Sequence, residues 1–574
     1  MIKNYLKIAW RNIVRHKAYS LINLSGLAIG MASSILILLW VQNELSYDRF
    51  HENSGQIYRI TADAGGFLAA VNPAGMPGAL KVQMPEVKNT VRLSHFTAVL
   101  FEAGTNKFEE KRVFYADDTF LQMFSFPLVK GNRNTALNRV DGVLITQAMA
   151  KKYFGQEDAI GKVLRKDNGS NVVVTGVLAN IPSNSHLQFD FVLPMSAIME
   201  TDRDLKTNSW GSFNFFSYIQ LDKSFVPSAA AIKKFDERIT AIYKTHQSGS
   251  QTLFHLQPLT AIHLAAPMQI DVDGHGNSQY VTIFFIVAVL ILVTACINFM
   301  NLATARSARR AREIGLRKVS GAVRGQLILQ FLSESVLISF FALLLALFLV
   351  YLFLPSFNIL ADKQLVINFS DARLWLTLIG IATLTGLISG SYPALFLSGF
   401  NPVAVLKGNM KSMGGNMNFR NGLVVTQFVV SILLLVGTFT IYNQLKFIRN
   451  RNPGFAKDNL LYLQMKGDLA DKQNTLKTEL KRNPLTANFT ITNTLPVNLS
   501  TGNLDVQWEG KDARSQIVIP SMNVDENFLS VFKMRILKGR GFSDKFKTDS
   551  NKFVINKTMM TVMGLNKNNA IGKP

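Results

Sequence analysis

The residue types that could carry out chemistry are few in this chain, and their spacing builds no active site. Residues 155–163, Gly-Gln-Glu-Asp-Ala-Ile-Gly-Lys-Val, resemble a phosphate-binding loop, but five residues separate the glycines where four are required. Val163 also replaces the hydroxyl residue that would hold magnesium. The eight histidines show no metal-ligand spacing, and no Gly-x-Ser-x-Gly nucleophile motif occurs. We expect a chain that is not an enzyme and holds no metal or cofactor, so that any ATP hydrolysis belongs to another polypeptide.

Charged side chains are most concentrated in a loop between two long apolar runs, residues 280–303 and 327–354. A single acid, Glu313, accompanies its basic residues, which are Arg306, Arg309, Arg310, Arg312, Arg317, Lys318 and Arg324. Each run is long enough to cross a bilayer, and basic loops between spans stay in the cytoplasm. We therefore predict that this loop faces the cytoplasm.

Topology alone does not account for the order of residues in this loop. Arg309, Glu313 and Arg317 lie four residues apart, and such an ion-pair ladder stiffens a helix. Gly315 suits a close approach to another surface, and Gly321 suits a helix stop. A rigid, glycine-notched helix between two spans can transmit force from a docked protein. The residues alone leave open both this interpretation and a loop that only sets topology.

The net charge of +23 would suit a nucleic-acid partner if it were spread over soluble domains. Instead, segments 1–20, 304–326 and 398–420 together carry a net charge of +14. Membrane topology explains most of the basicity, and we exclude nucleic acid as a partner. Cys296 is the only cysteine and lies within an apolar run, so the domains outside the membrane must fold without disulfides.

Long apolar runs that alternate with polar stretches predict an α-helical membrane protein with α+β extracytoplasmic domains and five transmembrane helices. The first unit of one plus three helices is complete, and the second is partial. The charge distribution predicts that the N-terminus lies in the cytoplasm and that the large domains lie on the other side of the membrane. The predicted segments are a cytoplasmic amphipathic helix at 1–20, membrane helices at 21–42, 279–303, 327–354, 372–397 and 421–444, periplasmic domains at 43–278 and 445–574, a cytoplasmic coupling loop at 304–326, an outer loop at 355–371 and a cytoplasmic connector at 398–420.

Small and amide side chains mark candidate contacts between the membrane helices. Gly26 and Gly30 lie four residues apart in the first helix, a spacing that lets another helix approach closely. Simple helix composition explains this pair nearly as well. Asn298 and Asn301 lie late in the second helix and Gln427 lies in the fifth. We favour hydrogen bonds between helices over a transport pathway for these amides.

The last segment repeats part of the first periplasmic domain. Residues 117–131 align with 525–539 at a constant offset of 408, and share Asp, Phe-Leu, Phe, Lys and Gly. Two shorter matches follow in the same order, 144–149 with 554–559 and 159–162 with 570–573. Several ordered matches after a membrane helix indicate a duplicated half, in which 445–574 partially repeats 43–162. We expect the parental chain to continue for about 200 to 250 residues, with three further membrane helices.

Residues 312–322, Arg-Glu-Ile-Gly-Leu-Arg-Lys-Val-Ser-Gly-Ala, resemble the cytoplasmic signature of MacB/FtsX-type ABC transporter permeases. The segments Tyr392-Pro393-Ala394 and Asn401-Pro402 resemble a proline segment that follows the last helix in that family. The resemblance extends over essentially the whole chain, and it implies that residues 43–278 form a MacB-like periplasmic core domain. The chain differs from the simplest four-helix pattern of the family because it fuses two units.

The resemblance implies that the chain is the permease subunit of an ABC transporter. A separate ATPase dimer, which carries ATP and magnesium, would push on a coupling surface, and the movement would reach the periplasmic domains. The residues of that surface are Arg309, Arg312, Glu313, Gly315, Arg317, Lys318, Gly321 and Pro402. Drugs, peptides and lipoproteins all suit export or extraction by such a protein, with membrane lipid and a periplasmic adaptor or outer-membrane protein as further partners. The alternative is an FtsX-like regulator that transports nothing and controls an envelope hydrolase.

Overall fold

The chain divides into two compact units, which are described separately. The membrane unit comprises the residues up to Leu45 together with Asn277–Asn450, and the second unit comprises Ser46–Gly276 and the residues from Arg451 onward. We call residues 46–276 the ectodomain and residues 451–573 the tail. The computed structural model describes residues 17–305, 314–399 and 417–573, apart from 452–453, 457–458, 466–467, 498, 500–501, 504–505, 513–516 and 567.

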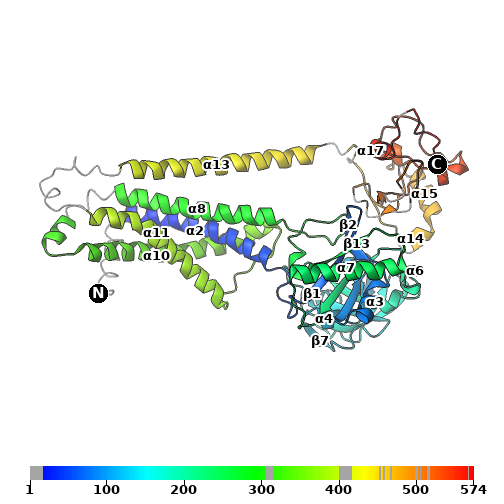
Figure 1. Cartoon of the computed structure of the whole chain (residues 1–574), viewed down its shortest axis with the longest axis horizontal. Coiled ribbons are helices and arrows are strands. Elements are labelled where there is room, and N and C mark those ends of the chain that lie inside the picture. The colour runs from blue at the N-terminus through cyan, green and yellow to red at the C-terminus, as the bar shows by residue number, and fades with distance from the viewer. Residues whose placement is uncertain are drawn as a thin grey trace. The chain divides into compact units, whose positions relative to one another are not determined.

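Within the described residues, the membrane unit contains five helices that are long and apolar enough to cross a membrane. They are α2 (Lys17–Leu45), α8 (Ser278–Ala305), α10 (Arg324–Ala361), α11 (Ala372–Ser398) and α13 (Met417–Asn450). Helices α2, α8, α10 and α11 pack side by side (Figure 1). Helix α13 contacts α8, where the Asn301 Nδ2 donates to the Gln427 Oε1 at 3.4 Å, and most of its apolar side chains are exposed. The chain is a multi-pass membrane protein.

Helix α10 runs further than the sequence predicts. A proline usually ends or kinks a helix, so the sequence places its end before Pro355, yet residues 355–361 of the predicted outer loop are helical. Asn358 supports this extension, because its side-chain amide donates to the Leu365 carbonyl and accepts from the Leu365 N–H, both at 3.0 Å. Asp362 then adopts a left-handed conformation, with φ of 50°, and ends the helix.

Small residues set the contact between α10 and α11. A Cβ added to Gly386 would lie 2.7 Å from the Ser339 Oγ, and one added to Gly390 would lie 2.6 Å from the Ser335 Oγ. The Ser339 Oγ also donates to the Ala382 carbonyl at 2.7 Å. Glycines four residues apart bring the two backbones close enough for serines to bond across the helices. This pair of glycines is visible in the sequence, but the sequence alone does not say which helix faces it.

The ectodomain is built on thirteen strands of one sheet. These are β1 (Ile57–Ala64), β2 (Phe67–Ala69), β3 (Val71–Asn72), β4 (Val87–Leu93), β5 (Thr97–Ala103), β6 (Asn106–Ala116), β7 (Leu128–Gly131), β8 (Gly142–Thr146), β9 (Val163–Lys166), β10 (Ser170–Leu178), β11 (Phe191–Pro194), β12 (Phe215–Leu221) and β13 (Leu253–Pro258). The path runs β11-β8-β10-β9-β5-β6-β4-β12-β1-β13. Because β11 pairs with both β8 and β6, the first six strands of this path close into a ring. The predicted α+β class is confirmed.

Three apolar clusters fill the ectodomain, and all three lie within residues 46–276. One lies inside the strand ring, where the rings of Phe101 and Phe191 stack with centroids 4.4 Å apart. A second lies between β12-β1-β13 and the helices α3 (Met76–Gln83) and α7 (Ala229–His246), which cover that part of the sheet (Figure 1). The third is rich in phenylalanine and includes the short helix α4 (Phe120–Met123). The remaining ectodomain helices are α5 (Gln147–Phe154), α6 (Arg203–Lys206), and the 3₁₀ turns η1 (Met195–Ile198) and η2 (Leu259–Ala261).

The tail repeats local details of the ectodomain. In the ectodomain, the Asp117 Oδ2 accepts from the Arg92 backbone N–H at 2.7 Å, just before α4. In the tail, the Asp525 Oδ2 accepts from the Ile491 backbone N–H at 2.9 Å, just before α16 (Phe528–Val531). The same bond at aligned aspartates supports the duplication that the sequence indicates. The other described tail elements are α14 (Asp468–Asp471), α15 (Gln473–Arg482), α17 (Lys557–Val562), η4 (Lys547–Asn551), β14 (Gly502–Asn503) and β15 (Ile519–Pro520).

Candidate coupling site

The structure describes half of the predicted coupling residues. The other four lie outside the described residues: Arg309, Arg312, Glu313 and Pro402. Gly315, Arg317 and Lys318 lie on a short helix over residues 314–319, and Gly321 follows this helix. The ion-pair ladder across the loop stays a prediction, because two of its three members are outside the described part of the chain.

Apolar contacts attach the short helix to α10 and α11. Ile314 is 1% exposed and packs in a cluster with Leu327 and Phe331 of α10 and with Ala394 and Leu397 of α11. Burying one isoleucine side chain is worth about 1.5 to 3 kcal/mol. The first turn of the short helix is therefore fixed to both long helices at once.

Cationic side chains hold the loop against the end of α11. The Lys318 Nζ donates to the Ser398 carbonyl at 2.7 Å, and the Arg324 Nε donates to the Ser398 Oγ at 3.4 Å. Ser398 is the last residue of α11, and the carbonyls at a helix C-terminus carry partial negative charge that favours cations. The Arg317 Nη1 donates to the Gln330 Oε1 of α10 at 3.2 Å. Burial, assisted by the neighbouring charge of Arg324, lowers the pKa of Lys318.

Gly321 ends the short helix through paired backbone hydrogen bonds. Its N–H donates to the Lys318 carbonyl at 3.1 Å, and the Ala322 N–H donates to the Arg317 carbonyl at 3.0 Å. This pair of bonds requires a left-handed residue, and Gly321 has φ of +95°. Gly315 lies on the buried side of the same helix.

Three apolar side chains face outward from the loop, and sequence reasoning missed them. Leu316, Val319 and Val323 are exposed by 60%, 66% and 60%. Leu316 also borders an open hollow together with Arg317 and Ser320. A group of exposed apolar side chains, here beside cations, is typical of a surface that contacts another protein. The signal was present as apolar residues at i, i+3 and i+7 within a highly charged loop.

Gly26 and Gly30 of α2 lie against α8. A Cβ added to Gly30 would lie 2.5 Å from the Ala295 Cβ, and one added to Gly26 would lie 3.3 Å from the Asn298 Nδ2. The two helices therefore approach each other along the face that carries both glycines.

The segment that resembles a phosphate-binding loop serves a structural purpose in the ectodomain. Gly155 ends α5 with φ of 63°, and the Lys162 Nζ lies 2.7 Å from the Glu157 Oε2. Its lysine is therefore paired with an acid rather than directed into an anion site. Among the described residues, no group of three or more His, Cys, Asp or Glu side chains could hold a metal ion.

The comparisons with known proteins match both units. The family model of the MacB-like periplasmic core domain matches residues 20–241, and that of the FtsX-like permease C-terminal matches residues 285–402. The chain belongs to the MacB/FtsX-type ABC transporter permeases. The second match contains the whole coupling loop, so the loop lies inside the part of this permease that defines the family.

Curated relatives cover this permease to different extents. YknZ of Bacillus subtilis, an uncharacterized ABC transporter permease, is 24% identical over 70% of this chain and 98% of its own length. The macrolide export ATP-binding/permease protein MacB of Burkholderia lata is 24% identical over 70% of this chain and 56% of its own length. The crystal structure of the periplasmic region of MacB from Actinobacillus actinomycetemcomitans is 13% identical, with a TM-score of 0.28, and covers 36% of this chain and 90% of that chain. This permease thus spans nearly all of YknZ but little more than half of that MacB protein.

Proposed function

We propose that this permease relays movement from a separate cytoplasmic ABC ATPase to its ectodomain, and that the relay drives export or extraction of a drug, peptide or lipoprotein across the envelope. The coupling loop would be the point at which the ATPase pushes. The relatives favour the bacterial inner membrane as its location, and the charge distribution favours an orientation with the N-terminus and the coupling loop on the cytoplasmic side. Membrane lipid and a periplasmic adaptor or outer-membrane protein would be its further partners.

The observation that carries this proposal is the two-sided construction of the coupling loop. One side is fixed to α10 and α11 by Ile314 and by the Lys318 bond to the Ser398 carbonyl. The other side exposes Leu316 and Val319. A surface built this way passes a push on its apolar side to two membrane helices without deforming, because the short helix is fixed at several points.

The relatives support a division of labour between polypeptides. YknZ, which aligns over 98% of its length, is named a permease, whereas the MacB protein of Burkholderia lata is named as both ATP-binding and permease. This chain aligns with 56% of the latter. Export is favoured over the regulator alternative because MacB of Burkholderia lata and PvdT of Pseudomonas fluorescens are named as exporters, of macrolides and of pyoverdine.

We expect Val319→Glu to detach the ATPase. A carboxylate in place of an exposed apolar contact would have to lose its water on docking, which costs about 2 kcal/mol or roughly a 30-fold loss in affinity. The measurement is affinity purification of the full chain from native membranes, followed by mass spectrometry of ABC ATPase subunits.

The matched control for this experiment is Val82→Glu, because Val82 is an equally simple exposed valine, 86% exposed, in the ectodomain helix α3. It should recover the ATPase at the wild-type level. If Val319→Glu recovered as much ATPase as the wild type, the exposed face of the loop would not be the docking surface.

Topology is tested with introduced cysteines. Ser170 in the ectodomain and Ser320 in the coupling loop are both exposed, and the native Cys296 is buried and can be replaced by alanine. A membrane-impermeant maleimide should label Ser170→Cys in intact spheroplasts and label Ser320→Cys only after lysis. The reverse pattern would invert the proposed orientation.

A further inference from the structure

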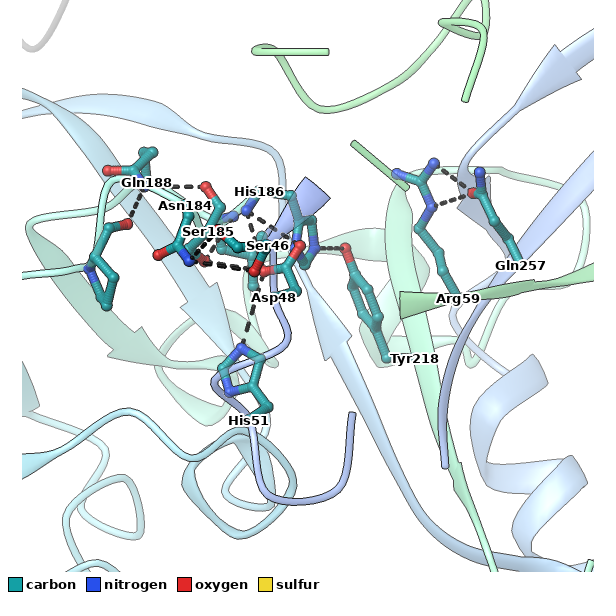
Figure 2. A network of polar contacts seen from close by, with 12 residues as sticks. Ser46, Asp48, His51, Arg59, Asn184, Ser185, His186, Gln188, Tyr218 and Gln257 are labelled. Atoms are coloured by element: carbon teal, nitrogen blue, oxygen red, sulfur yellow. Dashed lines mark hydrogen bonds and ion pairs between the residues drawn. The ribbon is translucent and has the colours of Figure 1, made fainter. Parts of the chain in front are cut away.

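A row of buried polar side chains crosses three neighbouring strands of the ectodomain. Strand β1 lies between β13 and β12, and the register places Arg59 opposite Gln257 on one side and opposite Tyr218 on the other. The Arg59 Nε and Nη2 donate to the Gln257 Oε1 at 3.1 and 2.7 Å (Figure 2). Arg59 and Tyr218 are both fully buried. Paired positions on adjacent strands share one face, so the three side chains form a continuous row.

One end of this row reaches the segment through which the chain comes in from α2. The Tyr218 hydroxyl lies 2.9 Å from the His186 Nε2, and the His186 Nδ1 lies 2.9 Å from the Asp48 Oδ2. The Asp48 Oδ1 accepts from the Ser185 Oγ at 3.2 Å and from the His186 N–H at 3.1 Å (Figure 2). Asp48 is fully buried, and its carboxylate is held by several donors of the ectodomain.

The other end of the row reaches the segment through which the chain leaves toward α8. The Arg59 Nη1 donates to the Asp271 Oδ1 at 2.5 Å, and the Nη2 donates to the Asp271 Oδ2 at 3.3 Å. The His275 Nε2 lies 3.0 Å from the same Oδ2. Asp271 is thus held in a two-point ion pair, and the side chain of Asp271 is only 5% exposed.

The two ends of the row lie close in sequence to the membrane helices. Asp48 follows Leu45, the last residue of α2, and His275 precedes Ser278, the first residue of α8. We call residues 46–51 the incoming segment and residues 271–276 the outgoing segment. Neither segment could shift alone without separating a buried charged or hydrogen-bonded pair, which is costly away from water.

We propose that the row Asp48–His186–Tyr218–Arg59–Asp271 ties the incoming and outgoing segments together, so that α2 and α8 move the ectodomain as one body. These five side chains would be positioning residues for the relay, and their role in it rests on the proposed function. The tie itself is a property of the chain alone and can be measured without any ATPase.

The test is whether a substitution at one end of the row changes the hydrogen-exchange rate of a backbone N–H at the other end. Hydrogen exchange is followed in the full chain in lipid nanodiscs. The reporter for the outgoing segment is the Gly276 N–H, which donates to the His263 carbonyl at 2.8 Å, and the reporter for the incoming segment is the Asp48 N–H, which donates to the Asn184 carbonyl at 2.8 Å. We expect Asp48→Asn to speed exchange at Gly276 at least fivefold, and Asp271→Asn to speed it at Asp48 by a similar factor, since coupling is reciprocal.

Tyr218→Phe removes the hydroxyl that contacts His186, which connects the Asp48 end of the row to the strands, and keeps the ring. In that background each aspartate variant should change the distant reporter by less than twofold. Tyr153→Phe is the matched control, because it removes another buried tyrosine hydroxyl, bonded to Glu110 at 2.9 Å in the strand ring, and should leave transmission intact. All rates are divided by that of the Val173 N–H in β10, so that a general loss of stability cancels.

Two results would overturn the proposal. One is that neither aspartate variant affects the distant reporter in the wild-type background. The other is that transmission persists in Tyr218→Phe, which would assign the coupling to a contact outside the row. The alternative contact is the stack of Tyr47 on His263, with centroids 3.3 Å apart.

Discussion

Arg59→Met should lower the free energy of unfolding of the ectodomain by about 3 to 5 kcal/mol, because it leaves a buried carboxylate without its cation. The side chain of Arg59 is fully buried, and that of its partner Asp271 is 5% exposed. Burial alone would raise the pKa of Asp271, but the hydrogen bond from His275 and the charge of Arg59 hold it at about 2. Methionine keeps most of the apolar stem of arginine, so the loss reports on the charge rather than on packing.

This loss can be measured on the fragment 46–276, because the three apolar clusters of the ectodomain lie wholly within it. Urea unfolding of the wild type and of Arg59→Met gives the difference in free energy. The control is Arg139→Met, which breaks an arginine–aspartate pair whose side chains are 57% and 46% exposed, and it should leave the unfolding midpoint unchanged. If the two variants unfolded at the same urea concentration, the buried Arg59–Asp271 pair would stabilise the ectodomain no more than the exposed Arg139–Asp141 pair does.

The features that sequence predicts well here depend on neighbours along the chain. The five membrane helices lie where the apolar runs predict them, because the length and composition of each run are enough to indicate a span. The duplication needs only a comparison of two stretches of sequence, whereas the bonds of the aligned aspartates reach backbone N–H groups 25 and 34 residues away. The extension of α10 past Pro355 was missed because the support comes from a loop residue, Leu365, that bonds back to Asn358.

The coupling loop also combines features that the local sequence predicts with contacts that it does not. The helix stop at Gly321 needs only bonds within the loop, so a glycine in a helical pattern is enough to suggest it. The bond from Lys318 to the Ser398 carbonyl joins residues eighty positions apart, and no local pattern points to it. The buried row of the ectodomain is harder still to predict, because its members become neighbours only through the strand order β12-β1-β13.

The ectodomain should also lose stability as the medium turns acidic, and His51 is the side chain that we expect to dominate this loss. Burial lowers the pKa of His51 to about 4, although the Asp48 carboxylate, 4.0 Å from its Nε2, acts in the opposite direction and His186 adds to the lowering. Its other neighbours are uncharged: the rings of Phe124 and Phe126 pack on it.

The sign of the effect follows from the direction of this shift. A histidine whose folded pKa lies below its unfolded value of 6.5 contributes its full stability above pH 6.5 and loses it as the pH falls toward 4. Between these pH values His51 is protonated in the unfolded chain but stays neutral in the folded chain. Between pH 7 and pH 4.5 the loss amounts to about 2 to 3 kcal/mol. Burial also lowers the pKa of His95, which acts in the same direction.

The measurement is the urea midpoint of the 46–276 fragment at several pH values between 4.5 and 7, for wild type and for His51→Asn. The asparagine oxygen can accept the Ser125 N–H that donates to the His51 Nδ1 at 3.0 Å, so the variant keeps this bond and removes the titration. Its stability should fall less steeply with acid than that of the wild type, whatever its stability at pH 7. His246→Asn, at an exposed position at the end of α7, should keep the wild-type slope. Identical slopes for His51→Asn and wild type would show that His51 takes up its proton without disturbing the fold, and that acid acts on the ectodomain elsewhere.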